Sequence, residues 1–385
     1  MNSLAQPSIK KADEIARVVN DVFADLELTE TQRNLARERY EAVGNWIAGS
    51  SDPFLQTSYM YAQGSLALDT SVKPIGRDEF DVDLVVHIPN GRGLTTAELK
   101  SKVGDRLKEH GRYRAILKEK NRCWRLDYAG DFHLDITPSV PNLACSNGGE
   151  LVPDRALKCW KPSNPRGYLR WFREISRQTP GRNLRKVASS QEPFPAHNQE
   201  PAWLPRIVQL IKRHRDVYFL SRNDGAFAPI SIILTTLAGR SYLSNLYRDH
   251  IDSPWSLIIE VTSDLPRMLE SEILAGRRLT VVSNPTTAGE NFADKWALDQ
   301  SYEMAFFEWH SQLVRDLEAL SNAEGIDGVF SSLRSSFGED AAIAATGKSL
   351  SEISDNRERS RLAVTSSGSL AATGRGMRSN TFFGS

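Results

Sequence analysis

Two short segments with the alternation typical of β-strands place the strongest constraint on how this chain folds. In residues 80–86, apolar side chains alternate with Asp81 and Asp83. Successive side chains of a strand point to opposite faces, so we expect both aspartates on one face and the apolar side chains against a core. Residues 131–137 repeat the pattern and carry Asp135 on the polar face. If the two strands are neighbours, three carboxylates converge.

Three carboxylates on a rigid sheet repel one another strongly unless a cation neutralises them. Oxygen ligands of this kind favour Mg²⁺ or Mn²⁺ over softer metals. We therefore predict a divalent-metal site at Asp81, Asp83 and Asp135, although an isolated D-x-D pair is usually solvent-exposed surface. His133 shares their face and could touch a ligand, orient a carboxylate or be structural.

A glycine turn precedes the first acidic strand. Residues 59–63 predict a short strand, and Gly64 allows the backbone to turn so that the following amides and the Ser65 hydroxyl face an anion. A phosphate group fits such a turn. The order of a Gly-Ser turn, a D-x-D strand and a later aspartate resembles the layout of the polymerase-β-like nucleotidyltransferases.

The composition argues against several classes of protein. The 385 residues include 48 Lys and Arg against 48 Asp and Glu, so the whole chain is not a cationic binder of polyanions, although a local basic patch could bind nucleic acid. The three cysteines form no C-x-x-C pair, which argues against a disulfide framework and a structural zinc. The sequence shows neither a signal-peptide core nor an apolar run of membrane-spanning length. We expect a cytoplasmic protein that needs no membrane.

Apolar periodicity predicts further elements around these strands. Residues 9–26 and 29–46 should form two helices that pack across the sheet as a brace. A capped helix should start at Thr95. Residues 112–119 and 122–128 predict additional strands, which lead into the strand of the third aspartate.

The middle of the chain contains the expected connection between two lobes. The strand that carries Asp135 should end at Pro138 and Pro141. Residues 160–177 interleave aromatic residues with arginines, a pattern that can stack a base but fits better a helix with buried aromatics. Residues 178–200 are rich in proline and predict a connecting segment.

From residue 203 onward the pattern is helical. One apolar stripe covers 203–219, an apolar helix follows Pro229, and helices should continue through 250–275 and 295–323. Beyond about residue 344 the composition shifts to Ser, Gly, Ala and Arg, which predicts a flexible tail. We expect three parts: a nucleotidyltransferase core with its helical brace at 1–190, a helical lobe at 191–343 and a flexible tail at 344–385.

Together the motifs resemble the bacterial CD-NTases, the cGAS/DncV-like nucleotidyltransferases of anti-phage CBASS operons. The resemblance covers most of residues 50–320. It is carried by Gln63-Gly64-Ser65, Glu79 to Asp83, His133 to Ile136, Arg206 to Asp216, Asn284-Pro285 and Glu290-Asn291-Phe292. It implies an α+β fold, in which a polymerase-β-like core with a mixed β-sheet is joined to a C-terminal helical lobe and the active site lies in the cleft.

The resemblance also implies roles for individual residues. The catalytic and metal-binding residues, holding two Mg²⁺ or Mn²⁺ ions, would be Asp81, Asp83 and Asp135. Asp135 would also help to deprotonate the attacking hydroxyl. The nucleotide-binding residues would be Gln63, Gly64, Ser65, Lys212 and Ser231. A ligand role is less secure for Asn284 and Asn291, because an asparagine before a helix is more often a cap than a ligand.

One position departs from the family's pattern. Where many relatives carry Leu-Gly-Thr, this chain has Leu68-Asp69-Thr70. Aspartate tolerates some turn geometries that suit glycine, but it adds negative charge near a polyphosphate. We expect Asp69 either to face away from the site or to contact a metal or a base. The zinc ligands of the eukaryotic relative have no counterpart, so activation by duplex DNA is not implied.

The resemblance implies an enzyme that joins NTPs, including ATP, into a cyclic di- or trinucleotide and releases pyrophosphate. Linear oligoadenylate-type, RNA-tailing or antibiotic-modifying transfer at the same metal site remains an alternative, as does a binding module without catalysis. The tail residues 381–385 place two aromatics at a polar end, a shape that another protein's groove can capture. The resemblance suggests a ubiquitin-conjugating-like or HORMA-type accessory protein there, and an unused end is equally consistent.

Overall fold

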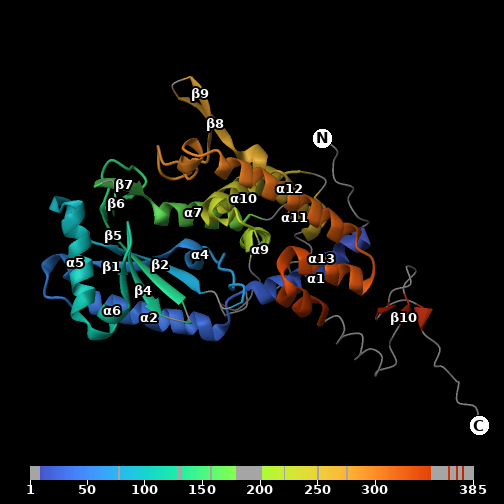
Figure 1. The fold of residues 1–385 in the computed structure, drawn as a ribbon, viewed down its shortest axis with the longest axis horizontal. Helices are drawn as coiled ribbons and strands as arrows, with labels where there is room; N and C mark the ends of the chain where they lie inside the picture. The colour runs from blue at the N-terminus through green and yellow to red at the C-terminus, as the bar shows by residue number, and fades with distance from the viewer. Residues whose placement is uncertain are drawn as a thin grey trace, which may run out of the picture.

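The protein is described by a computed structural model with two lobes (Figure 1). The described residues are 9–178 and 202–347, except 77, 78, 129, 131, 157, 221, 249, 250 and 275, together with three two-residue strands further on. Those strands are β10 (Ala363–Val364), β11 (Leu370–Ala371) and β12 (Arg375–Gly376). The expected lobe boundary at 190 and the tail residues 381–385 lie outside the described residues.

A seven-stranded mixed sheet forms the first lobe. The strands are β1 (Tyr59–Gln63), β2 (Phe80–His87), β3 (Leu117–Glu119), β4 (Trp124–Tyr128), β5 (Phe132–Pro141), β6 (Glu150–Asp154) and β7 (Cys159–Ser163). Their order is β1-β2-β5-β4-β3, with β6 paired to the end of β5 and β7 paired to β6. β2 and β5 are parallel neighbours, and the other pairs are antiparallel. The two strands predicted from their alternation therefore lie side by side near the middle of the sheet.

Helices cover the apolar face of this sheet. They are α2 (Glu30–Ala48), α3 (Pro53–Gln56), α5 (Thr96–Glu109) and α6 (Gly111–Ile116). Buried Val82 and Leu84 of β2 and Leu134 of β5 belong to one hydrophobic cluster with side chains of α2 and α5. Both α2 and α5 begin with a capping box. The opposite face of β2 and β5 is left for polar side chains, which is where the aspartates lie.

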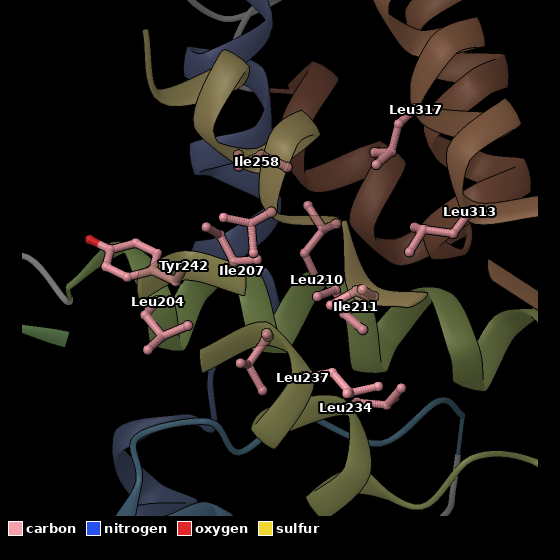
Figure 2. Close-up of a cluster of buried hydrophobic side chains, with 14 of the residues drawn as sticks. Leu204, Ile207, Leu210, Ile211, Leu234, Leu237, Tyr242, Ile258, Leu313 and Leu317 are labelled. Carbon is pink, nitrogen blue, oxygen red and sulfur yellow. The ribbon is translucent and has the colours of Figure 1, made fainter. Parts of the chain in front are cut away.

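The second lobe is built around α9 (Trp203–Leu220). Its other helices are α1 (Ile9–Leu26), α7 (Pro165–Ser176), α10 (Ser231–Asn245), α11 (Pro254–Ser263), α12 (Ser301–Asn322) and α13 (Gly325–Phe337). Figure 2 shows the centre of its core, where Ile207 and Ile211 of α9 lie among side chains of α10, α11 and α12. Because α9 is surrounded by the other helices, its apolar stripe is buried along most of its length.

Shorter elements complete the described chain. They are α4 (Gly64–Ala67), η1 (Gly91–Gly93), η2 (Gly225–Phe227), η3 (Leu265–Met268), β8 (Glu270–Leu274), β9 (Arg277–Val281) and η4 (Asp294–Ala297). β8 and β9 form a hairpin that projects from the helical lobe (Figure 1). None of the helices in the described part of the chain has both the length and the hydropathy required to cross a bilayer.

Two helices expected in the first lobe belong to the core of the second. Val19 and Phe23 of α1, and Tyr168 and Phe172 of α7, are buried in one hydrophobic cluster with α9. Of the two helices of the expected brace, α2 packs on the sheet and α1 does not. An apolar stripe predicts that a helix is buried on one side, but it does not identify the partner. The aromatics of α7 are core residues, in agreement with the favoured reading.

Two local predictions were wrong. Residues 112–116 form most of α6 rather than a strand, with His110 as its N-cap. β5, by contrast, ends at Pro141 as predicted and includes Pro138, because β4 pairs with it only as far as Ile136 and its pairing with β6 starts at Val140, so that the missing N–H of Pro138 breaks no ladder on that edge. The helix expected to reach 275 ends at Ser263, and the hairpin follows. Helical structure also extends past 343 to residue 347.

Candidate active site

The acidic face of β2 and β5 lies at a cleft of about 790 Å³ between the two lobes. Parallel pairing places Asp83 directly opposite Asp135, and Asp81 lies opposite His133. Asp81 and Asp83 line the cleft on the sheet side, and Lys212 and Ser231 line it on the side of α9 and α10. The three predicted aspartates therefore lie on neighbouring strands, but Asp135 is not among the residues that line the cleft.

Among the three aspartates, Asp83 has a raised carboxyl pKa. Burial, together with the charges of Asp135 and Asp81, raises the pKa of its carboxyl to about 7. Such a shift means that the surrounding residues do not compensate the negative charge that full ionisation would create. A site with uncompensated carboxylate charge fits divalent cations.

A residue that the sequence analysis missed, Arg125 of β4, pairs with two of the aspartates. Its Nε donates to Asp135 Oδ1 and its Nη2 to Asp135 Oδ2, both at 2.7 Å, and Nη2 also lies 3.1 Å from Asp81 Oδ1. β4 pairs with β5 so that Arg125 is opposite Asp135. Only the strand order reveals this contact, because the two residues belong to different predicted strands whose pairing the sequence does not specify.

The three aspartates are adjacent, but their oxygens are not gathered around one point. In the described part of the chain, the His, Cys, Asp and Glu ligand atoms found within 4.8 Å of one another are those of Glu79, Asp127 and His133. His133 Nδ1 lies 2.9 Å from Glu79 Oε2 and 3.3 Å from Asp127 Oδ1. His133 therefore faces these two carboxylates and does not orient Asp135.

The Gly-Ser turn forms as predicted, and its geometry depends on glycine. Gly64 begins the short helix α4 with φ of +64°, in the left-handed region. A Cβ at this position would overlap Asp83 Oδ2. Ser65 lines the cleft, and its hydroxyl accepts a hydrogen bond from Ser71 at 3.2 Å. Gln63 pairs with Asp83 across β1 and β2 but is not among the residues that line the cleft.

Lys212 reaches the cleft from the buried face of α9. Its ammonium donates to the Thr70 carbonyl at 2.7 Å, in the loop that follows α4. Burial, together with the positive charge of Arg215, lowers the pKa of Lys212 to about 8. Arg215 also donates to the Ser231 hydroxyl at 3.2 Å and lines the cleft, a position that the sequence analysis did not single out.

Asp69 faces away from the cleft, one of the two expected outcomes. It lines a separate cavity of about 470 Å³ together with Arg33 and Arg173. Its φ of +57° explains why glycine suits this position. Burial raises the pKa of the Asp69 carboxyl.

The two asparagines stabilise a loop. Asn284 donates to Glu290 at 2.7 Å and accepts from the Thr286 amide at 2.8 Å. Asn291 accepts from the amides of Val282 and Ala293, both at 2.9 Å. Neither asparagine is among the residues that line the cleft.

Comparisons with known proteins agree with this architecture. The profile of the Second Messenger Oligonucleotide or Dinucleotide Synthetase domain matches residues 15–175. A c-di-GMP synthase of Roseivirga ehrenbergii is 32% identical over 321 residues, which cover 83% of each chain. The cyclic dinucleotide synthase CdnG of Bradyrhizobium diazoefficiens is 26% identical over 363 residues, covering 87% of this chain and 83% of CdnG.

Solved structures show the same fold. The Bradyrhizobium diazoefficiens CD-NTase CdnG in complex with GTP matches with a TM-score of 0.66 at 23% identity, covering 88% of this chain and 100% of that one. The CdnC:HORMA-deltaN complex of E. coli MS115-1 matches with a TM-score of 0.60 at 14% identity, covering 88% and 98%. The motifs, the mixed sheet with its acidic strand pair and the curated relatives lead to one conclusion: the chain belongs to the bacterial CD-NTases and is a nucleotidyltransferase of the cyclic-oligonucleotide-synthesising kind.

Proposed function

We propose that this enzyme joins two nucleoside triphosphates, at least one of them GTP, into a cyclic dinucleotide and releases pyrophosphate. The observation that carries the proposal is the similarity, over most of both chains, to a protein named c-di-GMP synthase. The cleft supports it with acidic residues on one wall and a lysine on the other. The sequence analysis expected ATP, and the relatives add GTP as the substrate to test first.

The residues of the cleft fit a metal-dependent transfer. We propose that Asp81, Asp83 and Asp135 hold two Mg²⁺ or Mn²⁺ ions, because the raised pKa of Asp83 reflects negative charge that the site does not compensate. Two such ions, when bound, neutralise the triphosphate and activate the acceptor hydroxyl. Ser65 would donate to a phosphate oxygen, and Lys212 would add positive charge on the opposite wall.

The product itself tests the proposal. The purified enzyme is incubated with GTP, with ATP and with both, in Mg²⁺ or Mn²⁺, and the mixture is treated with phosphatase before mass spectrometry. We expect a phosphatase-resistant product with the mass of a cyclic dinucleotide that contains guanine. Products that lose terminal phosphates would support linear transfer instead. No release of pyrophosphate from any of the four NTPs, with either metal, would support a binding module.

Lys212 should control nucleotide affinity in a pH-dependent way. Its ammonium is charged below its pKa of about 8 and loses that charge as the pH rises above it. We therefore expect the KM for NTP in the wild type to increase between about pH 7 and about pH 9, because a charge-assisted contact to phosphate is lost. Lys212→Gln should increase KM about tenfold at pH 7 and remove this pH dependence.

An exposed lysine provides the control for this experiment. Lys108 of α5 lies in the other lobe and pairs with Asp105. Lys108→Gln should reproduce the wild-type KM and its pH profile. If Lys212→Gln kept the wild-type rise in KM with pH, another group would be responsible for it.

We also propose a cytoplasmic location and an accessory partner for the C-terminal tail. Support for a partner is indirect: a structural relative has been solved in a complex whose name includes a HORMA protein. The partner would be HORMA-type or ubiquitin-conjugating-like and would capture residues 381–385. Deleting residues 380–385 should abolish binding to such an accessory protein, and unchanged binding would contradict this part of the proposal.

A further inference from the structure

Arg125 occupies a position between two catalytic aspartates. Its Nη2 is bonded to both Asp135, at 2.7 Å, and Asp81, at 3.1 Å. With Nε on the second oxygen of Asp135, the guanidinium makes a bidentate pair, the strongest geometry that arginine offers to a carboxylate. One cation of the protein is thus shared by two carboxylates that the transfer reaction needs around a metal ion.

This arrangement differs from that of a metal site in its spacing. Ions such as Mg²⁺ lie about 2.1 Å from their oxygen ligands, whereas Nη2 lies 2.7 Å and 3.1 Å from its two oxygens. The described ligand atoms that all lie within 4.8 Å of one another do not include those of the three aspartates, so these carboxylates must move closer together to share one ion. A guanidinium nitrogen and a metal ion cannot both lie between Asp81 and Asp135, because they overlap and repel each other.

Arg125 and Asp81 are both partly exposed to solvent. The side chain of Arg125 is 20% exposed and that of Asp81 is 55% exposed, so both border solvent. Lys212, by contrast, is buried and fixed on the Thr70 carbonyl. Of these two cations near the aspartates, Arg125 is the one with a path out of the site.

We propose that Arg125 is an internal counter-ion that holds Asp81 and Asp135 in the metal-free enzyme and is displaced when divalent metal binds. The inference rests on the proposed metal-dependent function and adds a regulatory property to the same site. The metal affinity is set by competition with Arg125, so the enzyme remains metal-free, with Asp81 and Asp135 held by the guanidinium, until the metal concentration exceeds a threshold. Arg125 acts here as a positioning residue and takes no part in bond formation.

The direct test is Mn²⁺ binding without nucleotide, measured by electron paramagnetic resonance of the free ion. Arg125→Gln removes the competing charge, so the apparent Kd for Mn²⁺ should decrease about tenfold, as expected when charge-assisted hydrogen bonds no longer oppose binding. Arg125→Lys, which keeps the charge but loses the planar fork, should give an intermediate Kd. The metal-free melting temperature of Arg125→Gln should fall, and Mn²⁺ should raise it more than it raises that of the wild type.

Lys108 provides a control of the same charge. It is an exposed residue of α5 that pairs with Asp105, so Lys108→Gln makes the same change in net charge without touching the three aspartates or the group of Glu79, Asp127 and His133. Its Kd for Mn²⁺ should remain within about twofold of the wild type, as is usual for an exposed charge. A second control, Asp83→Asn, should abolish the binding that Arg125→Gln strengthens.

The results separate this inference from the proposed function. An unchanged or increased Kd in both Arg125 variants would overturn the inference, because Arg125 would then support the metal site or leave it unaffected. Survival of Mn²⁺ binding in Asp83→Asn would overturn it too, since the ion would lie elsewhere. A cyclic product together with an unchanged Kd contradicts only the inference, whereas a decreased Kd without any nucleotide product contradicts only the proposed function.

Discussion

Replacing Asp83 with asparagine is expected to reduce synthesis of the cyclic product by at least about 1000-fold. Phosphoryl transfer depends almost entirely on positioning and charge neutralisation, and removing one key group of this kind commonly costs two to three orders of magnitude or more. Asp83 is buried next to Asp81 and Asp135, so the amide removes a charge that the metal ions need. Initial rates of pyrophosphate release measure the loss.

The same substitution should not destabilise the fold. A raised carboxyl pKa means that the folded protein holds the proton more tightly than the unfolded chain does, so stability is lost as the pH rises through the folded value of about 7. At pH 8 the Asp83 carboxyl of the wild type is ionised and lowers the stability of the fold, whereas the asparagine variant has no charge at this position. Its melting temperature at pH 8 should equal or exceed that of the wild type.

Asp105 supplies the control for the effect on activity. It is an exposed aspartate of α5, paired with Lys108. Asp105→Asn should leave the rate unchanged. Substantial activity in Asp83→Asn, with the protein folded, would show that Asp83 is not part of the catalytic machinery.

Replacing Gly64 with alanine should reduce activity about 100-fold and also lower stability. The left-handed backbone alone costs about 1–2 kcal/mol for a residue with a Cβ, and the new methyl group would overlap the carboxylate of Asp83. Because Asp83 is one of the proposed metal ligands, its displacement would disturb the geometry of the site directly, and a misplacement of about 1 Å can cost about 100-fold in rate. The measurements are the rate of product formation and the melting temperature.

Gly276, at the turn of the β8–β9 hairpin, separates the two effects. It has a φ of +76°, similar to that of Gly64, but a Cβ there would meet nothing within 4 Å. Gly276→Ala should show the backbone cost without losing activity. If Gly64→Ala lost no more activity than Gly276→Ala, the close approach to Asp83 would have no catalytic importance.

The local parts of the site could be predicted from the sequence, since they depend on short-range rules. Alternation placed Asp81, Asp83 and Asp135 on polar strand faces, and Gly64 marked the turn. The parallel pairing of β2 and β5 then brought Asp83 opposite Asp135. The family resemblance supplied the helical lobe and the positions of Lys212 and Ser231, which do line the cleft.

The remaining features depend on which elements meet. Arg125 reaches Asp135 through the pairing of β4 with β5, and no local pattern encodes that register. The stripe of α1 looks the same whether it packs on a sheet or on helices, so its place in the helical lobe could not be foreseen. Residues 112–116 lie between a capped helix and a strand, and His110 caps the helix that they form.

The central claim is that the three aspartates together hold divalent metal once Arg125 has left them. Anomalous scattering from Mn²⁺, in crystals grown with a non-hydrolysable GTP analogue, tests it most directly. We expect manganese at about 2 Å from oxygens of Asp81, Asp83 and Asp135, with the Arg125 guanidinium withdrawn from Asp81. Manganese bound only at Glu79, Asp127 and His133, or Arg125 still bridging Asp81 and Asp135 in the loaded enzyme, would contradict it.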